Sequence, residues 1–184
     1  MTGLASRGQL RASLLRWSLF TVPACVLLGF LSGFLFQSGP DNPWFATLDK
    51  PAIYPPPALF GIVWTILYAM MGFALALVCA AWGARGRTLA IVLFGVQFAL
   101  NLGWTPTFFG AQQITAALVV MVLLDIALLA TIVAFWRVRR FAAVLLLPYL
   151  AWTLFATVLN YEFLRLNPDY DAPMPSNATQ RIEL

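Results

Sequence analysis

The sequence predicts an all-α membrane protein with a five-transmembrane-helix bundle. Hydrophobic residues make up 61% of its 184 residues and charged residues only 10%, against about 45–50% and about 25% in soluble proteins. So few charges cannot cover a hydrophobic core with a polar surface, and the same balance excludes intrinsic disorder. Several charge-free stretches reach the length of a membrane helix, about 20 apolar residues. These observations exclude a water-soluble fold.

Charge-free stretches give the expected helices in chain order: 17–36, 59–82, 88–109, 114–136 and 141–164. The first follows a basic N-terminal tail, residues 1–16, and its apolar run is too long for a cleaved signal peptide. The charge-free stretch 88–124 is too long for one helix, so we divide it at the break 110–113. A single membrane domain is therefore expected over residues 17–165.

Arginines predict the orientation of the bundle. With five spans, the N-terminal tail and the connections after the second and fourth helices share one side of the membrane, and they hold eight of the eleven basic residues and no acid. The positive-inside rule places this side, and so the N-terminus, in the cytoplasm and the C-terminus outside. An even number of spans would scramble this separation. We expect a bacterial cell-membrane protein.

One connection is long. Residues 37–58 hold six prolines, so most of the segment is expected to be extended or turn-like. Connections of this length are often functional, and a proline-stiffened segment can form an ordered lid. Residues 166–184 are expected to form a flexible C-terminal tail.

The third helix predicts two opposite faces. Gly95, Ala99 and Gly103 recur every four residues as a ridge of small side chains. Polar side chains at Gln97, Asn101 and Thr105 have the same spacing but are offset by two positions, which places them on the other side. The ridge suits close contact in a homodimer, or packing of small residues inside the bundle, and both uses are common.

Aromatic and amide side chains on the other helices indicate a pocket. The fifth helix carries Trp152, Ala156 and Asn160 in one row, and the second carries Trp64 and Tyr68 one turn apart. Converging aromatics and amides suit a flat, mostly apolar ligand. The alternative is an interfacial aromatic belt, which fits tryptophans at helix ends better than Trp64 and Trp152.

Other chemistry is limited by composition. The chain has no histidine, and its two cysteines stand apart, so we expect no metal site and no cofactor. The arginines end apolar runs instead of forming a basic stripe, which argues against nucleic-acid binding. Asp125 is an intramembrane carboxylate, which is costly at that depth and is often functional. The alternative is a hydrogen-bonded residue facing Gln97 or a threonine.

Several segments resemble the TspO/MBR family, the tryptophan-rich sensory proteins and translocator proteins. They are KPAIYPP with VWTILY, QFALNLGWTPTFFG, and PYLAW with ATVLNY and Arg165. The resemblance covers about residues 43–167. It implies a five-helix bundle, usually dimeric, that binds porphyrins such as protoporphyrin IX, sterols and benzodiazepine-type drugs under a lid formed by the first long loop.

The resemblance also implies specific residues. Matching positions give the pocket residues Trp64, Tyr68, Asn101, Trp104, Trp152, Ala156, Leu159 and Asn160. The family's sterol motif maps to Val158 or Leu159, Tyr161 and Arg165, a weak pattern by itself. One departure is that Ile53 and Tyr54 stand where the family usually has a loop tryptophan, and this disfavours the light-driven porphyrin breakdown attributed to some members.

The expected function is therefore a membrane receptor or carrier for tetrapyrroles and other flat apolar ligands, with a role in tetrapyrrole transport or signalling. One alternative is a photo-oxidative porphyrin-degrading enzyme. A second is a proton-coupled transporter using Asp125. The expected partners are a porphyrin or similar planar ligand, the lipid bilayer and a second copy of the chain.

Overall fold

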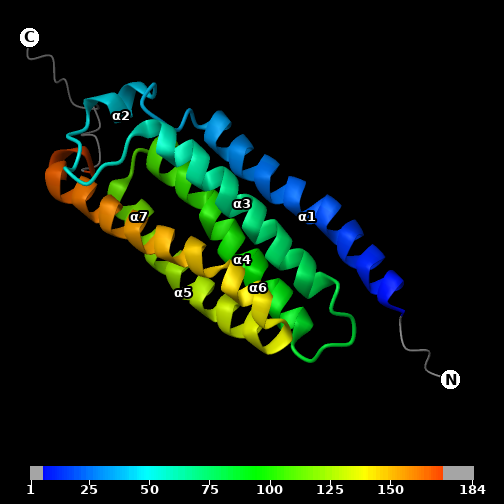
Figure 1. Ribbon diagram of the computed structural model, residues 1–184. Coiled ribbons are helices and arrows are strands. Elements are labelled where there is room, and N and C mark those ends of the chain that lie inside the picture. Colours follow the sequence, from blue (N-terminus) through cyan, green and yellow to red (C-terminus); the bar gives the residue numbers. More distant parts are fainter. Residues whose placement is uncertain (1–5, 172–184) are drawn as a thin grey trace, which may run out of the picture.

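A computed structural model describes residues 6–171 as an α-helical bundle (Figure 1). The elements in chain order are α1 (Arg7–Leu35), α2 (Pro43–Thr47), α3 (Pro57–Cys79), α4 (Arg87–Thr105), a π turn (Pro106–Gly110), α5 (Ile114–Val138), α6 (Arg140–Leu145), α7 (Leu147–Leu166) and a 3-10 turn (Pro168–Asp171). Within the described residues, five helical stretches are long and apolar enough to cross a membrane. The predicted all-α membrane bundle is confirmed.

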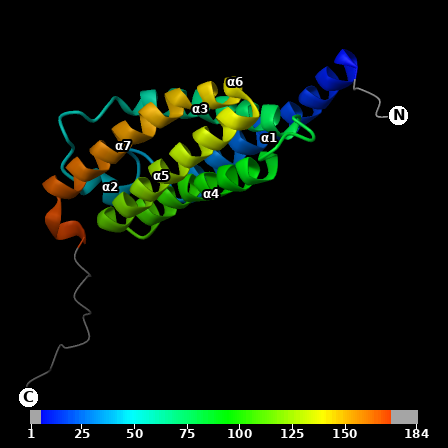
Figure 2. The ribbon, with the colours of Figure 1, turned by 90° about the horizontal axis from the view of Figure 1, so that it is seen from below.

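The first helix begins earlier than expected. α1 starts at Arg7 instead of about residue 17, so much of the predicted basic tail is helical. The cause is a capping box, in which Ser6 Oγ accepts from the Gln9 amide at 3.2 Å and Gln9 Oε1 accepts from the Ser6 amide at 2.8 Å. Charge-free length marks only the part of a helix inside the bilayer. Figure 2 shows the start of α1 extending beyond the other helices.

Prolines divide two of the expected helices. The predicted helix 141–164 is α6 followed by α7, with a turn at Leu146, because Pro148 has no amide hydrogen to continue the ladder. Likewise α4 ends at Thr105 and passes into the π turn at Pro106. The long loop, expected to be extended, contains the short helix α2, whose N-terminus is capped by the Asn42 side chain.

The final described residues extend the last span. α7 continues to Leu166 and is followed by the 3-10 turn, so the start of the expected tail is helical. The remainder of that expected tail, residues 172–184, lies outside the described residues.

Helix α1 packs along α3, while α5 packs against both α4 and α7 (Figures 1 and 2). The contact of α1 with α3 is close because Gly72 has no side chain. Its carbonyl accepts a hydrogen bond from Thr21 Oγ1 at 2.7 Å. A Cβ at Gly72 would lie 2.6 Å from the Val22 Cα and 2.7 Å from the Thr21 carbonyl oxygen. Those contacts are with backbone, which cannot move aside cheaply.

We therefore predict that Gly72→Ala destabilises the bundle by about 1–3 kcal/mol, the usual cost of overpacking. The measurement is thermal unfolding in detergent followed by circular dichroism. Gly61→Ala on the same helix is the control, because a Cβ there meets no atom within 4 Å. Equal melting temperatures for the two variants would contradict the tight α1–α3 contact.

Candidate ligand-binding cavity

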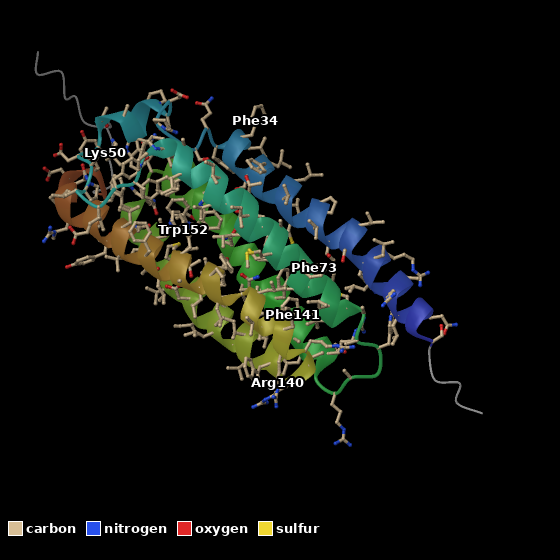
Figure 3. All side chains as sticks on the ribbon, in the orientation of Figure 1. Phe34, Lys50, Phe73, Arg140, Phe141 and Trp152 are labelled. Carbon is tan, nitrogen blue, oxygen red and sulfur yellow. The ribbon has the colours of Figure 1, made fainter. Side chains whose placement is uncertain are left out.

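A cavity of about 940 Å³ lies beneath the loop that joins α1 to α3. It is partly open, because exposed residues of α1 such as Phe34 line it. In Figure 3, Lys50 marks the lid end of the bundle, and Trp152 of α7 lies further along the bundle from that end. All eight sequence-predicted pocket residues line the cavity, namely Trp64, Tyr68, Asn101, Trp104, Trp152, Ala156, Leu159 and Asn160. The structure therefore brings them together, and their role in binding a ligand remains a prediction.

Aromatic rings form the walls of the cavity. Trp64 stacks on Tyr68 with ring centroids 5.2 Å apart, as its position one turn earlier on α3 allows. Trp104 stacks on Phe108 at 5.0 Å. Trp152 meets Phe60 edge to face at 5.7 Å. Flat rings presented from three helices suit a flat apolar ligand better than a flexible aliphatic one.

A chain of hydrogen bonds closes the inner end of the cavity. Tyr68 Oη donates to Asn101 Oδ1 at 2.9 Å, and Asn101 Nδ2 donates to Tyr149 Oη at 3.0 Å. Tyr149 Oη donates in turn to Gln97 Oε1 at 3.1 Å. Tyr149 and Gln97 are fully buried. These hydrogen bonds join α3, α4 and α7 and pair buried polar groups with one another, although Gln97 Nε2 is left without a partner among the described residues.

The second cavity amide, Asn160, is also bonded within the protein. Its Oδ1 accepts from Trp104 Nε1 at 2.9 Å, and its Nδ2 donates to the Ile114 carbonyl at 3.1 Å. The side-chain donors of Tyr68, Asn101 and Asn160 are thus bonded within the protein. Their main role in this structure is therefore to hold the helices in place. Among the described residues that line the cavity, Trp152 Nε1 is the buried side-chain polar atom without a partner. It can donate to an acceptor on a ligand.

The lid is fixed by an aromatic cluster around Phe45 of α2. Its ring centroid lies 5.4 Å from that of Phe109 and 5.5 Å from that of Phe163. Lys50 Nζ lies 4.3 Å from the Phe45 ring centroid and donates to the carbonyls of Phe45 and Leu48. Desolvation lowers the pKa of Lys50, although Asp49 opposes the shift. Burial raises the pKa of Tyr54. The lid is therefore a packed element rather than a loose linker.

Asn167 ties the lid to the end of α7. Its Oδ1 accepts from the Asp49 amide at 2.8 Å, and its Nδ2 donates to the Asp49 carbonyl at 3.0 Å. The same Nδ2 donates to the Phe163 carbonyl at 2.8 Å. One buried amide thus satisfies both backbone groups of a lid residue. This role of Asn167 was not predicted from the sequence, because its partner Asp49 lies far away in the chain.

Asp125 is buried on α5 and accepts from Thr157 Oγ1 at 2.7 Å. Its other oxygen has no partner among the described residues. The interpretation of Asp125 as a residue bonded to a threonine therefore fits the geometry. Asp125 does not line the cavity. Within the described chain, no group of three or more acidic or cysteine side chains could hold a metal ion.

The remaining predicted residues lie on outer faces. Gly95 and Ala99 are exposed on α4, and a Cβ at Gly95 or Gly103 would meet no atom within 4 Å. The ridge thus has no partner helix in the described part of one chain.

The sterol-motif residues Val158, Tyr161 and Arg165 form an exposed stripe on α7, whereas Leu159 is buried in the cavity. Arg165 pairs with Glu162 at 2.7 Å.

Helix α1 forms a further wall of the cavity, which was not predicted from the sequence. Gly29 and Gly33 line the cavity, and a Cβ at Gly29 would overlap the Tyr68 ring. Phe108, Phe109 and Phe163 also line it. Glycines on a helix give no signal of what they face, and phenylalanines are common throughout this chain. A four-residue spacing of glycines in α1 was the available clue.

Comparison with known proteins agrees with these features. The TspO/MBR family model matches residues 21–166. The chain is 46% identical over 145 residues to the tryptophan-rich protein TspO of Chlorobaculum tepidum, covering 78% of this chain and 91% of that protein. It is 43% identical over 136 residues to the human translocator protein, covering 73% and 80%. Protein CrtK of Rhodobacter capsulatus is 36% identical over 146 residues, covering 79% and 89%. The resemblance seen in the sequence is confirmed.

We predict that Asn167→Ala loosens the lid, because it removes both hydrogen bonds to the Asp49 backbone, each worth about 0.5–1.5 kcal/mol. Amide hydrogen exchange of peptides covering residues 43–50 should become faster by about tenfold, while exchange in α5 stays unchanged. Asp169→Ala, at an exposed position nearby, is the control. Unchanged exchange in the lid of the Asn167 variant would show that aromatic packing alone holds it.

Proposed function

The chain belongs to the TspO/MBR family, and on that basis we propose that its cavity binds a tetrapyrrole such as protoporphyrin IX in a membrane receptor or carrier. The cavity lies among membrane-spanning helices, beneath an ordered lid. Sterols and benzodiazepine-type drugs share the flat apolar shape and would compete for the same space. The protein's role is then to hold, transfer or sense tetrapyrroles in the bilayer.

The observation that carries the proposal is an aromatic cavity that holds one buried donor without a partner, Trp152 Nε1, among the described residues. Its volume of about 940 Å³ is at the upper end of the usual range for small-molecule sites. Trp64 and Trp152 offer ring faces for stacking, and Trp152 Nε1 offers a hydrogen bond to a carboxylate or carbonyl oxygen. The absence of histidine from the sequence removes the commonest axial ligand of haem. A metal-free ring is therefore the preferred form.

We also propose how the protein is oriented in its membrane and how two copies pair. The arginine-rich end of the bundle faces the cytoplasm of a cell membrane, as the positive-inside rule favours. The lid and the C-terminus then lie outside. Two copies pair through the Gly95–Gly103 ridge, since this ridge is open on the surface of one chain and small residues permit close helix contact.

We expect protoporphyrin IX to quench the tryptophan fluorescence of the purified protein saturably in detergent. Ala156→Phe should weaken this binding by about tenfold or more, a loss of about 1.4 kcal/mol, because the added ring occupies the cavity beside Trp152. The variant retains all seven tryptophans, so the probe is unchanged. Leu154→Phe, on the exposed face of the same helix, is the control. Equal affinities for both variants would count against the cavity as the binding site.

The dimer is tested separately. Gly95→Leu should shift the protein from dimer to monomer in lipid nanodiscs, measured by cross-linking, because a bulky side chain separates the ridges. The monomer fold should tolerate the change, since nothing lies within 4 Å of that position. Ala151→Leu, exposed on α7, serves as the control for added bulk. If the dimer fraction of the Gly95→Leu variant equals that of the wild type, this interface is excluded.

A further inference from the structure

A second concave site lies at the opposite end of the bundle, between α4 and α5. This groove has a volume of about 620 Å³. Leu89 and Leu93 line one side and Leu129 and Val133 the other, each pair one helical turn apart. Ala130 and Ala134 of α5 also line the groove, and their small side chains leave it open. Leu89, Leu129 and Val133 are each about half exposed, so the groove faces outward from the bundle.

Two arginines lie at the outer end of this groove. Arg85 precedes α4, and Arg137 lies in the last turn of α5. Neither guanidinium has a hydrogen bond or ion pair within residues 6–171. Their neighbours differ, because Arg87 donates to the Cys79 carbonyl at 2.9 Å and lies over Trp82, and Arg140 lies over Trp136. Arg85 and Arg137 thus differ from these neighbours, because both border the open apolar surface of the groove.

The charges of the two arginines are not balanced by the chain. The acids of the described residues are at the lid end of the bundle, apart from Asp125 in the middle of α5. Figure 3 labels Arg140 at the arginine-rich end and Lys50 at the lid end, and the two lie far apart. Two like charges at one site repel each other, and an anion between them offsets this repulsion. An anionic group from outside the chain would supply that balance.

We propose that this groove binds an anionic phospholipid of the surrounding bilayer, with its phosphate at Arg85 and Arg137 and an acyl chain between the leucines. The arrangement of charged and apolar residues along the groove matches such a lipid. The arginines lie at the boundary of the spans, where the headgroup would be, and the apolar residues lie within the spans. Basic sites between membrane helices recognise lipid headgroups in this way. Arginine also suits phosphate by its paired donors. This inference does not depend on the tetrapyrrole proposal.

The experiment is native mass spectrometry of the full-length protein in detergent, titrated with phosphatidylglycerol or with phosphatidylcholine of the same acyl chains. Wild type should retain phosphatidylglycerol at least about tenfold more strongly. The double variant Arg85→Gln with Arg137→Gln should lose that preference, since each charge contributes about 1 kcal/mol near a membrane surface, or about fivefold. Arg11→Gln with Arg16→Gln removes the same charge from exposed positions of α1 and should leave the preference intact.

A second pair of variants tests the acyl-chain part. Ala130→Phe fills the groove without changing charge and should weaken retention of phosphatidylglycerol by about tenfold. Ile126→Phe, on the same helix and 60% exposed outside the groove, should have no effect. Circular dichroism confirms that each variant retains its helices.

Three results would overturn the proposal. The first is equal retention of the two lipids by wild type. The second is equal loss of retention in the two double-arginine variants. The third is a shift between monomer and dimer masses in the groove variants with lipid retention unchanged, which would make the groove an interface between copies.

Discussion

The hydrogen-bond chain from Tyr68 to Gln97 is the interaction on which the rest of the structure depends. In a bilayer, apolar side chains have little reason to prefer one another over lipid, so polar contacts and close packing must specify how helices meet. Asn101 holds Tyr68 of α3 and Tyr149 of α7 to α4. Helix α3 makes few other contacts with α7, which leaves room for the cavity on the lid side of these bonds. The cavity is thus the space between an inner polar closure and an outer aromatic lid.

The two ends of the bundle are built on different chemistry. At the lid end, rings around Phe45 and the Asn167 amide hold the lid over the cavity. At the other end, Arg85 and Arg137 border an open apolar groove. The first end suits an enclosed ligand and the second suits contact with the membrane surface. The asymmetry follows from the same charge separation that predicts the orientation.

Much of this could be predicted from the sequence. Charge-free stretches located the five spans, and the four-residue spacing of Gln97 with Asn101 placed both inside the bundle, where they are buried. The eight proposed pocket residues, which the resemblance to the TspO/MBR family implied, line one cavity. The two amides among them also follow from cost, because polar side chains within a span are costly unless they point inward. The capping box at Ser6, the break before Pro148 and the bond of Asn167 to Asp49 were missed. These features depend on local backbone geometry or on contacts between distant residues. The length of an apolar stretch in the sequence indicates neither.

Gly29 couples the shape of the cavity to its polar closure. A methyl group at this position would occupy the space of the Tyr68 ring, and moving that ring would break its bond to Asn101. A larger residue at position 29 is then tolerated only together with a smaller one at position 68, and position 101 must adapt to the loss of its donor. These three sites should change in concert, as compensating substitutions, when the cavity is redesigned for a ligand of another size.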